Sequence, residues 1–169
     1  GRGVSDAARD ALSAEASAIV LDLRGNPGGL LHEAIAVAST FLEDGVVFRS
    51  VDRDGNEDRV RVRGAAVVPD LPMAVLVDYG SASSSEIVAA ALQDAGRATV
   101  VGETTYGTGT VLNIFPLSDG SAIRLGVQQW RTPDGESVFQ NGLVPDVEVG
   151  LPVDGVALEP SEIEDLTRA

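Results

Sequence analysis

The sequence predicts an α/β domain, with a mixed central sheet flanked by helices and a β-rich C-terminal segment. Two short apolar runs, residues 18–23 and 72–78, are rich in β-branched residues and suit buried strands. A loop of small residues follows each run, and apolar residues at helical spacing follow each loop, which is the order of elements in α/β folds. The chain has 169 residues, of which 44% are hydrophobic and 22% charged, so one core can form. We expect a single domain over residues 1–169, with its clearest elements in 5–150.

The first elements are a helix over residues 6–14, which has apolar residues at helical spacing, and the strand over residues 18–23. The turn over residues 24–29 reads "RGNPGG", and its glycines and proline break regular structure. A helix over residues 31–42 follows, because apolar side chains recur there on one helical face. Gly45 ends this helix.

Residues 46–52 and 58–64 alternate apolar with polar side chains on either side of an Asp-Gly turn, which predicts a hairpin with one wet face at the periphery. The second buried strand, residues 72–78, leads through a serine-rich loop into a helix over residues 86–95. The elements expected after it are strands over residues 98–102, 110–117 and 121–130, a turn-rich segment with a last short strand, and a weakly held helix from Glu159.

Composition excludes several classes of function. A net charge of −14 and a pI near 4.2 repel nucleic acid and anionic membrane surfaces, so neither is expected as a partner. No apolar run approaches the roughly 18 residues of a membrane span, and the first residues lack the pattern of a signal peptide. The chain has no Cys and a single histidine, His32, which argues against a metal site, and we expect no cofactor.

The serine-rich loop reads "DYGSASSSEIVAAAL" and raises the question of a nucleophile. In α/β folds, ligands gather where loops leave the carboxyl ends of strands, and helix N-termini bind anions. Gly28 and Gly29 in the first loop can bring amides close to a ligand oxygen, while a serine of the second loop attacks the carbon that bears it. In the alternative interpretation, residues 81–85 only cap the following helix, with Glu86 completing a capping box.

Four blocks occur in order, and the first two are "LDLRGNPGGLLHEAIAVASTFL" and "VLVDYGSASSSEIVAAALQDAGRATVVGETTYGTGTV". The others are "PLSDGSAIRL" and "TPDGESVFQNGLVPDVEV". Together they resemble the catalytic core of the carboxyl-terminal processing peptidases, or tail-specific proteases. The resemblance implies a crotonase-like core, polypeptide substrates and a location outside the cytoplasm. Members of the family also carry a signal or anchor and a PDZ domain upstream of this core.

The resemblance also implies roles for particular residues. Ser83 corresponds to the nucleophile, three residues before the glutamate that opens the helix, which is Glu86 here. The amides of Ser84 and of Gly29, the second glycine of the Asn-Pro-Gly-Gly turn, correspond to the oxyanion hole. Ser81, Ser84 and Ser85 are then loop and cap residues.

The general base of the family is a lysine 25 residues after the serine, and that position holds Thr108 in this chain, which has no lysine. The glutamine that orients this lysine in many members corresponds to Leu112. A threonine hydroxyl cannot accept the serine proton near neutral pH, so we expect Thr108 to hydrogen-bond Ser83 without deprotonating it. His32 is an alternative base, since its intrinsic pKa is suitable and it lies one turn into the helix behind Gly29.

The remaining candidate bases are the carboxylates of Glu86 and Glu103, which serve only if their pKa is strongly raised. The resemblance therefore implies a serine endopeptidase of the C-terminal processing type, impaired where no other base replaces the lysine, with a catalytically inactive peptide-binding module as the alternative. A crotonase-like enzyme acting on a thioester is a third hypothesis. Asp22 and Arg24 are expected to form a buried ion pair that holds the first loop, and Trp130 to belong to the core or to a peptide groove.

Overall fold

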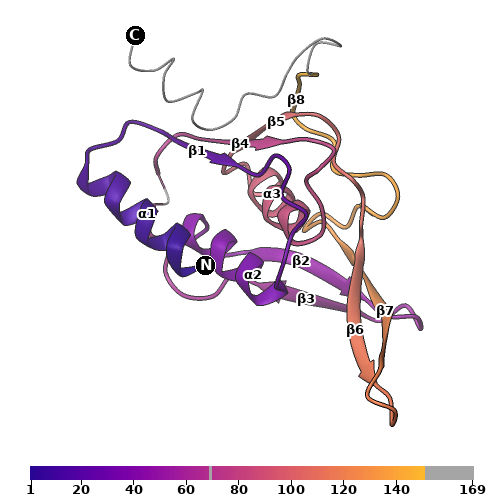
Figure 1. Cartoon of the computed structure of the whole chain (residues 1–169). Coiled ribbons are helices and arrows are strands. Elements are labelled where there is room, and N and C mark those ends of the chain that lie inside the picture. The colour runs from indigo at the N-terminus through magenta and orange to yellow at the C-terminus, as the bar shows by residue number, and fades with distance from the viewer. Residues whose placement is uncertain (69, 151–169) are drawn as a thin grey trace.

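The computed structural model describes residues 1–68 and 70–150 and confirms the α/β fold. Parallel and antiparallel strands occupy two separate four-stranded sheets, with helices packed against them (Figure 1). The predicted C-terminal helix from Glu159 lies outside the described residues. The helices and strands are α1 (Arg2–Ser13), β1 (Ile19–Asp22), α2 (Leu31–Phe41), β2 (Val46–Val51), β3 (Glu57–Arg61), β4 (Met73–Val77), α3 (Ser84–Asp94), β5 (Thr99–Gly102), β6 (Thr110–Pro116), β7 (Ala122–Arg131) and β8 (Val147–Glu148).

The first sheet is parallel and has the order β1-β4-β5-β8. Its two central strands, β4 and β5, supply fully buried valines such as Val75 and Val100. The apolar runs of the sequence become strands here because helices cover one face of the sheet. The carboxyl ends of β1 and β4 lie side by side, since Asp22 is in register with Leu76. The two loops singled out in the sequence therefore leave the sheet at the same edge.

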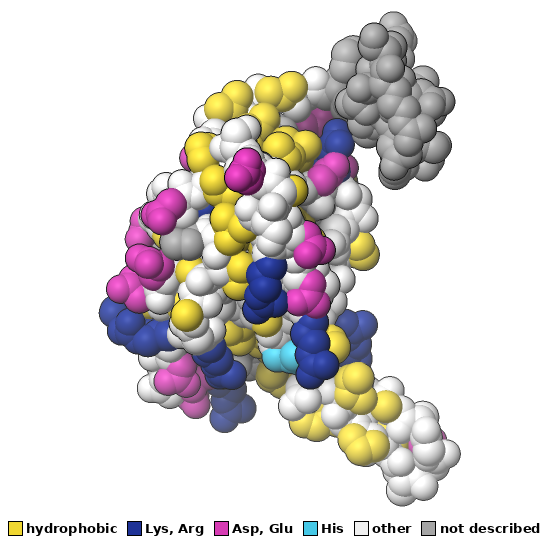
Figure 2. Space-filling model, turned by 90° about the vertical axis from the view of Figure 1, so that its left-hand side faces the viewer, with side chains coloured by type: hydrophobic (Ala, Val, Ile, Leu, Met, Phe, Trp, Pro, Cys, Tyr) yellow, Lys and Arg dark blue, Asp and Glu magenta, His cyan; other side chains and the backbone are white. Residues whose placement is uncertain are grey.

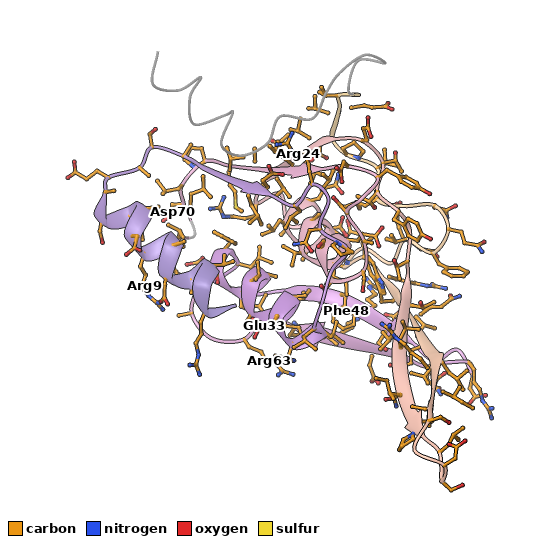
Figure 3. All side chains as sticks on the ribbon, viewed as in Figure 1. Arg9, Arg24, Glu33, Phe48, Arg63 and Asp70 are labelled. Carbon is orange, nitrogen blue, oxygen red and sulfur yellow. The ribbon has the colours of Figure 1, made fainter. Side chains whose placement is uncertain are left out.

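The second sheet is antiparallel and has the order β3-β2-β7-β6. The expectation that the β2–β3 hairpin is peripheral is wrong, because Val47 and Phe48 on β2 are 0% and 1% exposed. Strand β2 lies inside the sheet, pairing with β3 on one side and β7 on the other, and it packs against α3. Figure 3 labels Phe48 on this strand.

Helix α3 lies between the two sheets, which explains its composition (Figure 1). Every residue from 85 to 92 is buried, including the run of alanines and Leu92. A helix enclosed on all sides needs small and apolar side chains around its whole circumference. Helix α3 packs on α2, β2 and β5, so the position of its first residues is fixed from several directions.

The β6–β7 hairpin extends beyond the body of the molecule (Figure 1). Most residues of both strands are exposed, including large apolar side chains such as Ile114 and Leu125. The hydrophobic side chains on this projection are visible at the lower end of the space-filling view in Figure 2. No helix in the described part of the chain is long and apolar enough to cross a membrane.

Candidate active site

Hydrogen bonds join the two loops that leave β1 and β4. The amide of Ala82 donates to the carbonyl of Asn26 at 3.0 Å, and the amide of Gly25 donates to Asp78 Oδ1 at 2.8 Å. The hydroxyl of Ser81, which is fully buried, donates to the carbonyl of Leu23 at 2.7 Å. Ser81 is therefore a structural residue that fixes one loop to the other, as expected of a serine that is not the nucleophile.

Gly28 lies directly against the serine loop. Its φ is +92°, and a Cβ built at this position would lie 2.6 Å from the carbonyl oxygen of Ala82, 2.8 Å from Ser84 N and 2.9 Å from Ser83 Cβ. No side chain fits at such distances, so the Asn-Pro-Gly-Gly turn needs glycine here to approach the backbone around Ser83. Gly29, by contrast, borders open space.

Ser83 has an unusual backbone conformation, with φ of 56° and ψ of −118° at the N-cap of α3. A non-glycine residue with positive φ costs about 1–3 kcal/mol and persists only where the surrounding structure enforces it. The hydrogen bonds of both loops and the enclosed helix α3 supply that enforcement here. The strain falls on the one serine that the sequence singled out as the nucleophile.

Glu86 is fully buried and accepts four hydrogen bonds. Its Oε2 receives the amides of Ser83 at 2.7 Å and Thr108 at 3.1 Å. Its Oε1 receives the Thr105 hydroxyl and the Gly107 amide, both at 2.6 Å. Protein donors occupy both oxygens of this carboxylate, which disfavours the hypothesis that Glu86 is the base. The arrangement instead ties the serine loop to residues 105–108.

Thr108 thus approaches the site through its backbone, since its amide shares one carboxylate oxygen with the amide of Ser83. Among the described residues, no hydrogen bond joins the hydroxyls of Thr108 and Ser83, contrary to our expectation. The hydrogen bond to Glu86, at 3.1 Å, uses the backbone N–H of Thr108, so nothing in this network directs the threonine side chain to the serine. The loop is further fixed by a bond from the amide of Tyr106 to the carbonyl of Ser81 at 3.1 Å.

Gly29 and Ser84 both border the hollow beside Ser83. Gly29, Ser83 and Ser84 line a pocket of about 250 Å³ whose remaining wall comes from β6, β7 and the starts of α2 and α3. Within the described residues, neither the Gly29 nor the Ser84 amide donates a hydrogen bond to a protein group. A second hollow, of about 400 Å³, also borders Gly29 and Ser84 and lies over α1, α2 and β1. Both amides are therefore available to an oxygen bound between the two hollows.

His32 and Glu103 are not among the residues that line the two hollows. The side chain of His32 is 69% exposed, with Nε2 3.6 Å from Glu33 Oε1, and it lines neither hollow. The backbone of Glu103 continues from β5, where its amide donates to the carbonyl of Val77. In the described parts of the chain, no group of three or more histidine and acidic side chains could hold a metal ion.

Asp22 and Arg24 form the expected ion pair, but the expectation of burial is wrong, since their side chains are 48% and 44% exposed. Arg24 Nε and Nη2 donate to the two oxygens of Asp22 at 2.9 and 2.7 Å, and these bonds lower the pKa of Asp22. Asp22 is the last residue of β1, and Arg24, labelled in Figure 3, follows it in the loop. The pair supports the loop that carries Gly28.

Trp130 combines both roles considered for it, because the side chain is 1% exposed and also lines the pocket beside Ser83. Sequence reasoning missed Thr105, whose hydroxyl donates to Glu86 and accepts the amide of Leu143 at 2.8 Å. The density of threonine and glycine in "GETTYGTG" was the available signal, and Gly107 and Gly109 both adopt positive φ there.

Comparisons with known proteins match this core. Residues 1–149 match the profile described as "Peptidase family S41". The chain is 42% identical over 138 residues to a carboxyl-terminal-processing protease of Synechocystis sp., covering 82% of this chain and 32% of that protein. It is 39% identical over 138 residues to the carboxy-terminal processing protease CtpA of Bacillus subtilis, covering 81% and 29% respectively.

Among solved structures, the fold matches the photosystem II D1 C-terminal processing protease with a TM-score of 0.80 and 34% sequence identity. That match covers 91% of this chain and 42% of the other. The chain thus spans about a third of the length of the curated relatives it matches, where the covered shares are 32% and 29%.

Proposed function

Because the chain belongs to peptidase family S41, we propose that it is the core of a serine endopeptidase that hydrolyses peptide bonds in polypeptides. The observation that carries this proposal is a serine in a strained backbone conformation next to the amides of Gly29 and Ser84, which donate to no protein group among the described residues; all three residues line one pocket. Ser83 Oγ is the nucleophile, and the amides of Gly29 and Ser84 hold the developing oxyanion. The activity is proposed to be of the C-terminal processing type.

The chemistry begins when Ser83 Oγ attacks the carbonyl carbon of the scissile bond, whose oxygen becomes an anion. The two amides stabilise this charge, and collapse of the intermediate breaks the C–N bond. The leaving nitrogen takes up the proton that the serine has lost and departs as an amine, and the acyl group stays on Ser83. Water then attacks the acyl carbon and releases the acid. The proton of the serine must reach a base, and this is the step for which the chain supplies no amine.

Typical rate enhancements indicate how much hydrolytic activity remains when the lysine base is absent. A positioned base contributes about 10²- to 10⁴-fold, whereas an oxyanion hole and binding site retain roughly 10³- to 10⁴-fold over water. We therefore propose slow hydrolysis by this chain, with Thr108 at the position of the family's base. By the family resemblance, we also place this activity outside the cytoplasm.

A second candidate is a catalytically inactive pseudopeptidase that binds peptides or takes part in assembly. The absence of lysine and the exposed position of His32 favour it, since no described side chain takes the role of base beside Ser83. In this case the pocket and both amides would bind a peptide carbonyl without cleaving it.

Reaction with a fluorophosphonate separates the two candidates, because the reagent modifies an activated serine irreversibly. We expect slow labelling of the purified chain at Ser83, located by mass spectrometry, and none in Ser83→Ala. Slow casein cleavage that disappears in the same variant supports the peptidase. Labelling and cleavage that are both absent, with peptide binding retained, overturn the peptidase in favour of the binding module.

A further inference from the structure

Strand β6 forms the outer edge of the antiparallel sheet. Among the residues that the structure describes, it pairs with β7 alone, with Asn113 opposite Leu125 and Phe115 opposite Ile123. The amide of Leu117 continues this series by donating to the carbonyl of Ser121 at 2.8 Å. Because hydrogen-bonded residues alternate along an antiparallel strand, the backbone groups of the residues in between point away from β7.

Leu112 and Ile114 are those intervening residues. The amide of Ile114 donates to the side chain of its own neighbour, Asn113 Oδ1, at 3.0 Å, which agrees with an amide on the free side of the strand. An exposed edge of this kind binds other backbones, since it presents donors and acceptors at the spacing of a strand. The free edge of β6 is therefore a built site for an extended chain.

This edge is continuous with the candidate active site. The side chains of Leu112 and Ile114 line the same pocket as Ser83 and Gly29. Leu112 is 43% exposed and Ile114 64%, so both present apolar surface to solvent. A strand added along β6 would pass beside Ser83 while its alternate side chains contact these two residues.

Arg124 gives the pocket a charge. It lies on β7 directly opposite Ile114, so the two side chains share a face of the sheet, and both line the pocket. Among the described residues Arg124 has no acidic partner, although the chain carries a net charge of −14. An arginine without a partner beside apolar side chains is suited to receive a carboxylate from a ligand.

We propose that the free edge of β6 binds the substrate as an added strand, an extended peptide with apolar side chains over Leu112 and Ile114 and an acidic side chain at Arg124. This inference rests on the proposed peptidase function and names the class of segment that it takes. Strand β6 continues beyond Ile114, the residue opposite Arg124, as far as Pro116. A bound peptide can therefore also continue beyond the position that faces Arg124. For this reason we assign the carboxylate to a side chain of the peptide and not to its C-terminus.

A second copy of the protein is a poorer occupant of the same edge. Pro116 has no amide to donate, and the exposed cation of Arg124 would face its own copy, features that protect natural edge strands from pairing with one another. A peptide that carries a carboxylate avoids this repulsion.

Binding is measured by fluorescence anisotropy with the Ser83→Ala variant, so that cleavage plays no part. The probe is a short capped peptide of alternating valine and threonine with one central glutamate, labelled at one end. Methylation of single peptide amides should weaken binding at every second position, by about tenfold or more, and leave the intervening positions within about twofold. Effects without this period of two would overturn the added strand.

Variants of the protein test the same edge. Leu112→Pro removes an outward amide and should weaken binding about tenfold, whereas Leu112→Ala keeps the amide and should lose less. Circular dichroism and urea unfolding establish that both variants fold. If Leu112→Pro is folded and binds as well as Leu112→Ala, the edge is not the site.

The role of the Arg124 charge is tested by measuring how the Arg124→Gln variant binds peptides with and without a carboxylate. This variant should bind the glutamate peptide about three- to tenfold more weakly and the matching glutamine peptide unchanged. A third peptide, without glutamate but with a free α-carboxylate, distinguishes the source of the charge. If only this third peptide depends on Arg124 for binding, the ligand of Arg124 is a C-terminal carboxylate and the proposed acidic side chain is overturned. If sedimentation shows a dimer that does not bind peptide, a second copy of the protein occupies the edge and the proposed peptide site is overturned.

The experiments distinguish a failure of the proposed hydrolysis from a failure of the proposed binding mode. Period-two binding without any cleavage or fluorophosphonate labelling would leave the edge site standing and overturn the peptidase. Casein cleavage that depends on Ser83 but is unaffected by Leu112→Pro and Arg124→Gln would do the reverse.

Discussion

Glu86 is the residue on which the candidate site depends most. It fixes the amides of Ser83 and Thr108 with one oxygen and residues 105–107 with the other, and it does so without solvent contact. The sequence predicted the glutamate as a helix cap, which it is, but a cap needs only the bond to Ser83 N. The other three donors come from a loop about twenty residues later, and that distant partner is invisible to local pattern.

Replacement of Glu86 by glutamine keeps the size of the side chain and turns one acceptor into a donor. An amide group would then face two donors, so we expect a loss of about 2–3 kcal/mol in the free energy of unfolding. Fluorophosphonate labelling of Ser83 should fall at least about tenfold, since the serine backbone loses its hydrogen bond. Urea unfolding and labelling rates measure the two effects. Glu148→Gln, at an exposed glutamate on β8, is the matched control and should leave both unchanged.

Asp22 gives the site region a weak dependence on pH. Arg24 lowers the pKa of this carboxyl in the folded state, so the ion pair stabilises the fold above the ordinary pKa of aspartate and loses its effect as pH falls through the lowered value. The pair is about half exposed, and we expect Asp22→Asn to cost at most about 1 kcal/mol at pH 7. The difference between the two proteins should shrink between pH 7 and an acidic pH below the lowered pKa of Asp22, where the carboxyl is protonated in the folded state too. Unfolding in urea at both pH values tests this, and an equal difference at both would contradict it.

At the scale of elements, local patterns were sufficient where packing follows from the local sequence. The strands over 73–77 and 99–102 and helix α2 agree with the predicted ranges to within about a residue, because continuous apolar runs and helical spacing are local features. The β2–β3 hairpin was placed at the periphery because its alternation indicated one wet face. Its pairing with β7 joins residues about eighty positions apart, for example Arg49 with Arg131, and the hairpin sequence contains no sign of it.

Phe48 tests the role of β2 in the core. The side chain is 1% exposed and belongs to the hydrophobic core, so Phe48→Ala leaves a cavity in the core around β2. We expect a loss of about 3–5 kcal/mol in the free energy of unfolding. Val20→Ala, at a β1 side chain that is 63% exposed, should change stability by less than about 0.5 kcal/mol. Equally small losses in the free energy of unfolding of both variants would contradict the placement of β2 in the core.

For the whole molecule, the acidic net charge conceals an uneven distribution. Five of the 12 basic residues lie on the β2–β3 hairpin or directly after it: Arg49, Arg53, Arg59, Arg61 and Arg63. Another, Arg124, lies in the pocket beside Ser83. Basic side chains are visible in the lower part of the molecule in Figure 2. The arginines of the hairpin alternate with Asp52, Asp54, Glu57 and Asp58, and three of them form ion pairs there, so Arg124 is the arginine that brings positive charge to the pocket.

The part of the site that the parallel sheet carries could be predicted from the sequence, whereas the part that the antiparallel sheet carries could not. Both strand-loop-helix units of the parallel sheet were recognisable from their apolar runs, and they carry Gly29, Ser83 and Ser84. The wall of the pocket opposite them comes from β6 and β7, whose exposed apolar side chains showed no pattern of a binding site. A pocket formed between two sheets depends on how they pack, and that packing is set by α3, which both of them contact.

The identity of the base decides whether the whole assembly turns over substrate. The amides of Thr108 and Ser83 donate to the same oxygen of Glu86, and Leu112 lines the pocket. Lysine at position 108 and glutamine at position 112 would restore the base and the orienting residue that the family resemblance implies. A neutral amine accepts the serine proton and the carboxamide orients it, so Thr108→Lys with Leu112→Gln should raise casein turnover. The gain could approach about 10²- to 10⁴-fold, less if the new lysine remains well solvated and charged.

Casein turnover by the double variant is compared with that of the unmodified chain, and Ser83→Ala in both backgrounds should abolish it. Turnover of the unmodified chain that depends on Ser83 but is not raised by the double substitution would contradict the missing-base hypothesis. The base would then have to come from elsewhere, with His32→Ala as the variant to examine. Such a result would require a rearrangement of the start of α2, because the His32 side chain is 69% exposed and paired with Glu33.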